Sequence, residues 1–349
     1  MAFREARLTT PYTVGVSNNL RPTMRINRKL IISIGVIAII IISYLVIDSI
    51  LFNGIKPKPI NENGFQVNFF AKENIENKTA VVLIGGGQWG DYWSQEIANK
   101  EMVGISLPYI GKEGLPNLPE EIDLEYFESA LNWIRKQKSV DPKKIIVMGA
   151  SRNAELALII ASIFPDMVSG VIAYTPSSVS WSNTVLPYNS NELKASWKYN
   201  GIDIPYLPMT KISGNDTEKI RMLDYWENGL SKIDSTHKSH IKVELIKGPI
   251  LLFSGVDDKV WPSAKMADMI ENRLTNNNFK YNFKSIKYQN AGHSISTNPK
   301  QLSDLRIGKI NINGKNYEYE FGGTAEGDLN AKKNAYLQVF EFLLNIKND

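Results

Sequence analysis

The sequence predicts an α/β fold in which a mostly parallel sheet is covered by helices on both faces. Short apolar runs alternate with segments of helical spacing, a pattern typical of repeated strand–helix–strand units. Hydrophobic residues make up 43% of the 349 residues and charged residues 22%, so the chain can bury a globular core. Strands are expected at residues 80–84, 102–107, 144–148, 168–174, 250–254 and 283–288, and helices at 124–137, 155–164 and 329–346.

An apolar run near the N-terminus predicts a transmembrane anchor. Residues 30–47 carry no charge and would span about 27 Å as a helix, close to the thickness of a hydrocarbon core. Residues 1–29 hold six basic residues and one acidic residue, whereas only Lys56 and Lys58 follow the run closely. The positive-inside rule then predicts a cytoplasmic N-terminus and a periplasmic or extracellular body. A buried helix and a cleaved signal peptide are the alternatives; no small-residue cleavage site follows, which favours an uncleaved anchor over residues 30–52.

The charge balance and the lack of cysteine narrow the function further. Of the 40 basic and 36 acidic residues, 34 and 35 lie after residue 29, so the body is nearly neutral and has no footprint typical of nucleic-acid binding. The absence of cysteine excludes disulfides, thiolate zinc sites and cysteine nucleophiles. We expect no cofactor and no bound metal.

Residues 53–78 are expected to be a connector with an edge strand at 64–70, and residues 79–349 to form the catalytic domain.

A serine lies between a β-branched apolar strand and a helix, in the segment 145–158. Ser151 at this sharp turn is typical of a nucleophile elbow, whose strained backbone brings the residues two before and two after it close together. Gly149 fits that demand. Asn153 stands where glycine is usual, so we expect its amide to find a partner or the helix to lie slightly further from the strand. The alternative role for Ser151 is the N-cap of an ordinary helix.

A serine hydroxyl needs a base, and the chain has three histidines. His293 lies on a loop just after the expected strand at 283–288, where a base is expected. Asp258 follows the strand at 250–254 and is expected to orient the imidazole; Asp257 is the second candidate. The order serine, aspartate, histidine along the chain is that of the α/β-hydrolase fold.

Backbone N–H groups near the nucleophile are expected to bind the oxyanion of a tetrahedral intermediate. The Arg152 N–H lies at the start of the helix. Gly86, Gly87 and Gln88 follow the strand at 80–84 and could give the second donor, because glycine lets the backbone approach a substrate closely. Neither a Gly-Lys-Ser/Thr sequence nor a G-x-G-x-x-G pattern is present, which speaks against phosphate binding.

Residues 181–240 are expected to form a lid-like insertion. An aromatic lid would suit an apolar acyl chain, whereas packing within a subdomain is the alternative. His237 and His240 are spaced for one helical turn, a weak sign of a metal site, but we expect them to be surface residues. The aromatic residues of the insertion are Trp181, Tyr188, Trp197, Tyr199, Tyr206, Tyr225 and Trp226.

Several of these motifs together resemble one family. They lie at residues 115–120, 124–127, 149–158, 174–181, 248–252, 255–263, 291–293 and 322–324. Over about residues 79–346 the chain is similar to the C-terminal catalytic domain of acyl-CoA thioesterases and bile acid-CoA:amino acid N-acyltransferases. The resemblance implies a triad at Ser151, Asp258 and His293 that acts on an acyl thioester or a related ester. Family members that transfer acyl groups to amino acids carry cysteine as nucleophile, so the serine favours hydrolysis.

The predicted topology bears on the substrate. Acyl-CoA is a cytosolic metabolite, whereas the charge pattern places the catalytic domain outside. We therefore expect a small-molecule ester, thioester or amide other than acyl-CoA, and contact with the lipid bilayer through residues 30–47. Two other functions remain open: a catalytically inactive hydrolase fold that serves as a membrane-tethered scaffold, and a peptidase of the same fold.

Overall fold

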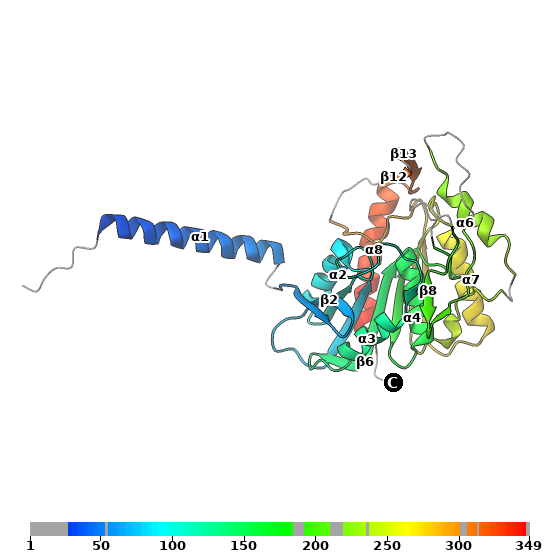
Figure 1. The fold of residues 1–349 in the computed structure, drawn as a ribbon, viewed down its shortest axis with the longest axis horizontal. Coiled ribbons are helices and arrows are strands. Elements are labelled where there is room, and N and C mark those ends of the chain that lie inside the picture. The colour runs from blue at the N-terminus through cyan, green and yellow to red at the C-terminus, as the bar shows by residue number, and fades with distance from the viewer. Residues whose placement is uncertain are drawn as a thin grey trace, which may run out of the picture. The chain divides into compact units, whose positions relative to one another are not determined.

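The computed structural model describes residues 27–52, 55–183, 192–209, 219–234, 237–300, 306–312 and 314–346 (Figure 1). Four of the six basic residues in the predicted tail and Tyr188 of the predicted lid lie outside the described residues. The chain divides into two compact units, residues 1–53 and residues 54–349.

The described part of the first unit forms one helix, α1 (Arg28–Phe52). Within the described residues it is the one helix that is both long and apolar enough to cross a membrane, over Arg28–Ile50. Its side chains from residue 30 to residue 47 are exposed on all sides, as a segment that buries its apolar surface in lipid would be. A membrane anchor therefore stays our prediction for this segment.

An eight-stranded sheet forms the centre of the second unit, in the order β1-β2-β4-β3-β6-β7-β10-β11. From β4 to β11 all neighbours are parallel, whereas β1 and β2 pair antiparallel with each other and β2 pairs antiparallel with β4. The predicted mostly parallel sheet is thus confirmed. The strands are β1 (Lys58–Glu62), β2 (Phe65–Phe70), β3 (Lys78–Ile84), β4 (Val103–Leu107), β6 (Val140–Ala150), β7 (Gly170–Tyr174), β10 (Ile250–Gly255) and β11 (Phe283–Tyr288).

Helices cover both faces of this sheet (Figure 1). One face packs against α3 (Glu125–Ile134), α4 (Arg152–Ile163) and α7 (Ser263–Asn276). The other packs against α2 (Gly87–Asn99) and α8 (Ala325–Leu344). Alternate side chains of each central strand enter opposite cores: Val147 of β6 lies in the first core and Ile146 in the second. This alternation explains why these strands are continuous apolar runs in the sequence.

The remaining elements lie outside the main sheet. Residues 176–249, between β7 and β10, contain α6 (Met222–Leu230), the 3₁₀ turn Val243–Leu245 and the strands β8 (Trp197–Tyr199) and β9 (Ile202–Asp203). These two strands join β5 (Ile122–Asp123) in a three-stranded sheet. A hairpin of β12 (Ile307–Ile312) and β13 (Lys315–Glu320) precedes α8.

Two differences from the sequence prediction concern these elements. Residues 53–78, which we expected to be a connector with an edge strand at 64–70, contain that strand as β2, but β1 also forms there and pairs with β2, so β1 lies at the edge of the sheet. The hairpin and helix α7 were not predicted.

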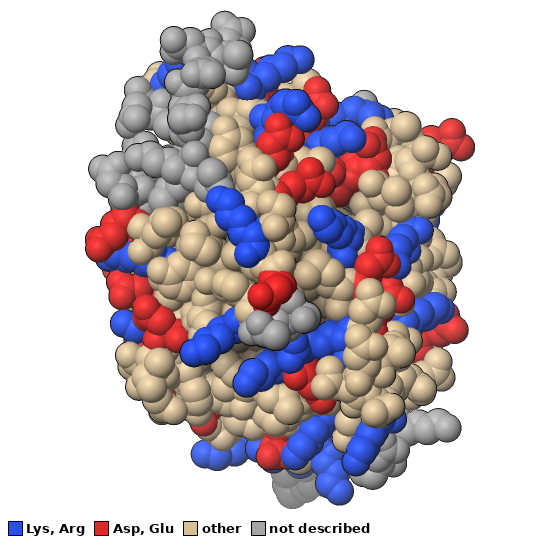
Figure 2. All heavy atoms as spheres, turned by 90° about the vertical axis from the view of Figure 1, so that its right-hand side faces the viewer, with Lys and Arg blue, Asp and Glu red and all other residues tan. Residues whose placement is uncertain are grey.

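Figure 2 shows the right-hand side of Figure 1, where basic side chains are interspersed with acidic and uncharged ones.

The two-sided core predicts a contrast between a buried and an exposed apolar residue. Ile146→Ala should lower the free energy of unfolding by about 2–5 kcal/mol, because Ile146 is fully buried in β6 and its loss leaves a cavity. Leu337→Ala on α8 is the matched control. Because Leu337 is 63% exposed, this substitution should alter the free energy of unfolding by no more than about 0.5 kcal/mol. Urea unfolding followed by tryptophan fluorescence measures both, and equal shifts would contradict this packing.

Candidate active site

Ser151 occupies a strained turn between β6 and α4. Its backbone has φ 57° and ψ −126°, a conformation that non-glycine residues rarely adopt. The Ser151 N–H donates to the Tyr174 carbonyl at 2.9 Å, which ties the turn to the end of β7. A Cβ on Gly149 would lie 2.1 Å from the Asn153 carbonyl oxygen, so only glycine lets helix and strand approach this closely. The sequence therefore produces the predicted elbow geometry at this position.

Asn153, which stands where glycine was expected, has found a partner. Its Oδ1 accepts a hydrogen bond from the Tyr109 hydroxyl at 2.8 Å. The other end of the amide lies against Gly85, where a Cβ would come within 2.2 Å of Asn153 Nδ2. The asparagine therefore packs α4 against the glycine loop that follows β3, and it brings that loop next to the elbow.

The three residues predicted as a triad lie together. His293 Nε2 is 3.0 Å from Ser151 Oγ, and His293 Nδ1 is 2.9 Å from Asp258 Oδ2. Because a carboxylate only accepts, Nδ1 carries the hydrogen and Nε2 is free to accept the serine proton. The His293 N–H donates to the Phe321 carbonyl at 2.9 Å, and the edge of Trp261 packs on the ring at 6.0 Å between centroids. These contacts fix the imidazole between its two partners.

Asp258 is held by four donors. Its Oδ1 accepts from the backbone N–H groups of Val260 at 2.9 Å and Trp261 at 3.2 Å. Its Oδ2 accepts from the Ser263 hydroxyl at 2.7 Å as well as from His293. The residue is 5% exposed. A buried carboxylate with this many donors is suited to hold a protonated imidazole opposite it.

Asp257, the second candidate for this role, faces another way. Its carboxylate forms an ion pair with Lys259 at 2.7 Å and accepts from the Gly323 N–H at 3.0 Å. The hydrogen bond from Lys259 lowers the pKa of Asp257. The structure thus places Asp258, and not Asp257, against His293.

The N–H groups expected to bind an oxyanion lie at the N-termini of α2 and α4. Gly86 and Ser151 precede these helices with similar backbone angles, φ 55° and ψ −138° for Gly86 against φ 57° and ψ −126° for Ser151. The Gly86 N–H donates to a carbonyl of β3 at 3.2 Å, so it is already used. Within the described part of the chain, no hydrogen bond engages the N–H groups of Arg152, Gly87 or Gln88.

Aromatic side chains of the insertion reach the histidine. Trp181 packs edge-on against Trp226 at 4.9 Å, Trp226 against Trp261 at 5.5 Å, and Trp261 against His293. All three tryptophans are buried. Trp197 is also buried, whereas the tyrosines at 199, 206 and 225 are half-buried. The insertion therefore packs on the loop after β10, and Trp261 of that loop connects it to His293.

The sequence analysis missed one charged residue at this site. Glu155 lies one turn after Ser151 on α4 and is fully buried. Burial raises the pKa of its carboxyl, and the neighbouring Arg152 guanidinium opposes that rise. A glutamate among Ala154, Leu156 and Ala157, three residues after an arginine, was the available signal, because a buried charge requires a partner.

His237 and His240 lie apart from the triad. The His237 Nδ1 is 2.7 Å from the Ser239 hydroxyl, and the His240 Nε2 is 2.7 Å from the Asp234 carbonyl oxygen. Both histidines line a cavity of 540 Å³ near the C-terminal end of α4. The described residues contain no group of three side chains able to hold a metal ion.

Comparisons with known proteins identify the family. Residues 122–347 match the family described as "BAAT / Acyl-CoA thioester hydrolase C terminal". Acyl-coenzyme A thioesterase 6 of Homo sapiens is 24% identical over 293 residues, which cover 83% of this chain and 65% of that protein. Mitochondrial acyl-coenzyme A thioesterase 2 of Mus musculus is 27% identical over 299 residues, or 83% of this chain and 60% of that protein. The chain thus spans somewhat under two thirds of the length of these relatives.

A solved esterase from Thermogutta terrifontis is 14% identical, with a TM-score of 0.49, and the match covers 84% of this chain and 92% of that one. At this score the match has no bearing on substrate or mechanism. The family match is more informative, because it takes in more than half of the chain and includes the positions of Ser151, Asp258 and His293. The chain belongs to the BAAT/acyl-CoA thioester hydrolase C-terminal family of α/β-hydrolases.

Proposed function

We propose that this protein is a membrane-anchored serine hydrolase that cleaves an acyl ester or thioester through an acyl-enzyme. The observation that carries the proposal is the position of the His293 imidazole, whose two nitrogens lie 3.0 Å from Ser151 Oγ and 2.9 Å from Asp258 Oδ2. This is the arrangement that a serine nucleophile, a general base and an orienting carboxylate require.

In the first half of the reaction, His293 Nε2 takes the hydroxyl proton while Ser151 Oγ attacks the acyl carbonyl carbon. The imidazolium that forms is stabilised by Asp258. The N–H of Arg152 and one from Gly87 or Gln88 hold the oxyanion of the tetrahedral intermediate. When this intermediate collapses, the bond to the leaving thiol or alcohol breaks, and His293 gives its proton to the leaving group.

In the second half, the acyl group remains as an ester on Ser151. His293 now removes a proton from a water molecule, whose oxygen attacks the same carbonyl carbon. The second tetrahedral intermediate uses the same oxyanion donors. Its collapse breaks the bond to Ser151 Oγ, returns the proton to the serine and releases the carboxylic acid.

The surroundings of the site favour an apolar acyl group. The tryptophans at positions 181, 226 and 261 place a buried aromatic cluster beside His293. The names of the curated relatives support a thioester or ester as the reacting bond. The apolar helix α1 and the basic residues before it support anchoring with the catalytic unit outside, where acyl-CoA is absent. We therefore propose an ester or thioester other than acyl-CoA as the substrate.

A fluorophosphonate probe tests the serine chemistry. Wild-type protein should be labelled on one serine, because the base activates Ser151 toward phosphorus as it does toward carbon. Ser151→Ala should abolish labelling while circular dichroism stays unchanged. Ser129→Ala, on α3 and outside the site, is the control and should label like the wild type. A folded wild type that takes up no probe would instead support the scaffold function.

The neighbouring aspartates offer a matched test of the orienting group. Asp258→Asn should lower kcat by about 10³–10⁴, because the amide favours the wrong imidazole tautomer. Asp257→Asn should change kcat by about threefold at most, since it removes only a half-exposed ion pair. A screen of activated esters, thioesters and peptides supplies the substrate, and peptide cleavage alone would favour the peptidase function. Similar losses in the two variants would argue against the proposed role of Asp258.

Reporters fused to the C-terminus test the orientation. Alkaline phosphatase, which needs its disulfides, should be active in the fusion, and green fluorescent protein fused at the same place should stay dark. Fusions to residues 54–349 alone are the control and should give the opposite result. A full-length chain that behaves like this control would refute the external placement and would bring acyl-CoA within reach of the site.

A further inference from the structure

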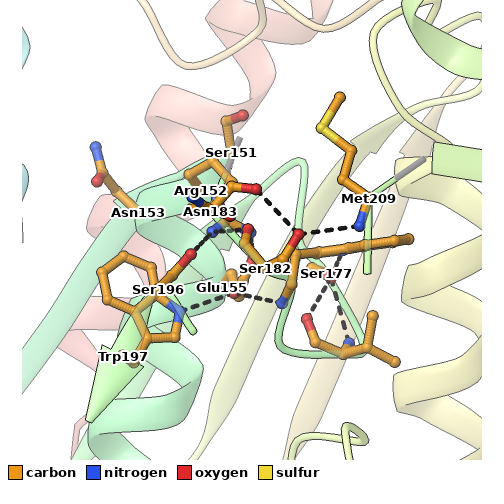
Figure 3. A network of polar contacts seen from close by, with 12 residues as sticks. Ser151, Arg152, Asn153, Glu155, Ser177, Ser182, Asn183, Ser196, Trp197 and Met209 are labelled. Atoms are coloured by element: carbon orange, nitrogen blue, oxygen red, sulfur yellow. Dashed lines mark hydrogen bonds and ion pairs between the residues drawn. The ribbon is translucent and has the colours of Figure 1, made fainter. Parts of the chain in front are cut away.

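The buried carboxylate of Glu155 gathers donors from distant parts of the chain (Figure 3). Its Oε1 accepts from the Trp181 N–H at 3.0 Å and from Trp197 Nε1 at 2.8 Å, and its Oε2 accepts from Arg152 Nη1 at 2.5 Å. The two tryptophans belong to the insertion, whereas Arg152 is the residue after the nucleophile. A fully buried charge is tolerated only when it is paired in this way.

The Arg152 guanidinium binds Glu155 with one of its terminal nitrogens and the insertion with the other (Figure 3). Its Nη2 donates to the Ser182 carbonyl at 3.1 Å and to the Ser196 hydroxyl. The group also lies over the ring of Trp197, 5.5 Å from the centroid. Arginine suits this place because its planar fork holds several acceptors in fixed directions, which a lysine cannot do.

The residues held by this pair are bonded to further parts of the insertion and to its neighbours. The Ser182 hydroxyl accepts from the Met209 N–H at 3.0 Å. The Asn183 side chain accepts from the Lys194 N–H at 3.0 Å. The Ser196 carbonyl accepts from a backbone N–H of β5 at 2.9 Å. One ion pair at the start of α4 thus anchors residues 181, 182, 196 and 197 and, through Ser182, Met209.

We propose that the Arg152–Glu155 pair is a positioning device of the active site. It clamps the insertion against the elbow and, because the Arg152 side chain is held on both sides, fixes the peptide group whose N–H faces the oxyanion. The inference rests on the proposed function, since it assigns two positioning residues to the same reaction. Neither side chain needs to touch the substrate.

A role in positioning can be separated from a role in stability. Replacing both members of a buried ion pair by apolar residues of similar volume is often neutral for stability, whereas removing one member is costly. The uncharged double variant Arg152→Met/Glu155→Gln should therefore fold with a Tm close to that of the wild type: neither charge is left unpaired, and the glutamine oxygen still accepts from the Trp181 and Trp197 N–H groups. It would nevertheless lack the bonds to Ser182 and Ser196, so the insertion and the oxyanion N–H would lose their fixed places.

The test is steady-state hydrolysis of a p-nitrophenyl ester together with the rate of fluorophosphonate labelling. The double variant should keep its Tm and lose about 10–100-fold in kcat and in labelling rate, approaching the effect of a lost oxyanion donor. KM should change less than kcat. The matched control is Arg273→Met/Glu244→Gln, a second ion pair with 2.5 Å contacts that lies between α7 and the 3₁₀ turn, and it should leave kcat unchanged.

A double variant with the kcat of the wild type would overturn the inference. If that variant does not fold, Arg152→Lys decides: it keeps the charge and reaches one partner at a time, so kcat should fall about tenfold, and an unchanged kcat would overturn the inference. Failure of the proposed function has a different signature. In that case the wild type itself is not labelled, whereas a failure of the positioning role leaves the wild type active and the variants equal to it.

Discussion

The close approach of strand β6 to helix α4 is the constraint on which the site depends. Gly149 has no side chain, so the backbone of Asn153 can pack directly on it. That contact accompanies the positive φ of Ser151, through which the chain turns from β6 into α4. The strain is borne by the surrounding core, because eight consecutive residues of α4, from 154 to 161, are buried. A buried helix directly after the turn keeps Ser151 in one place.

Parallel strands bring the other parts of the site to the same edge. Ser151 follows β6, Asp258 follows β10, His293 follows β11, and the loop with Gly87 follows β3. Since the carboxyl ends of parallel strands meet at one edge of a sheet, residues up to 142 positions apart become neighbours without a special connection. The insertion packs against this edge of the sheet: its Trp226 contacts Trp261, which follows β10 and in turn contacts His293.

Much of this could be predicted from the sequence because it is encoded locally. Ser151, Asp258 and His293 each lie within about five residues of the end of a strand that the sequence indicates, so the fold and the three residues follow from patterns within about ten positions. The sequence favoured Asp258 by its distance from the end of the strand and kept Asp257 as second candidate, because the direction in which the turn points each side chain is not encoded locally. The role of Glu155 was hidden for a similar reason: its partners Trp181 and Trp197 are 26 and 42 positions away.

The hairpin before α8 shows the reverse case, in which a local signal was present and was missed. An Asn-Gly pair at positions 313–314 stands between two runs of alternating residues, a strong indication of a two-residue turn.

Helix α2 begins within the glycine triplet, which breaks the helical pattern in the sequence, although Gly86 supplies the backbone conformation that the start of the helix needs.

The clamp at the start of α4 also limits how such enzymes can be recombined. The insertion is attached to the elbow by bonds to main-chain and side-chain groups at positions 181, 182, 196 and 197. A foreign insertion placed between β7 and β10 would leave a buried arginine and a buried glutamate without acceptors and donors unless it supplied equivalents. Chimeras between members of this family should therefore exchange the insertion and the first turn of α4 together, as one inherited module.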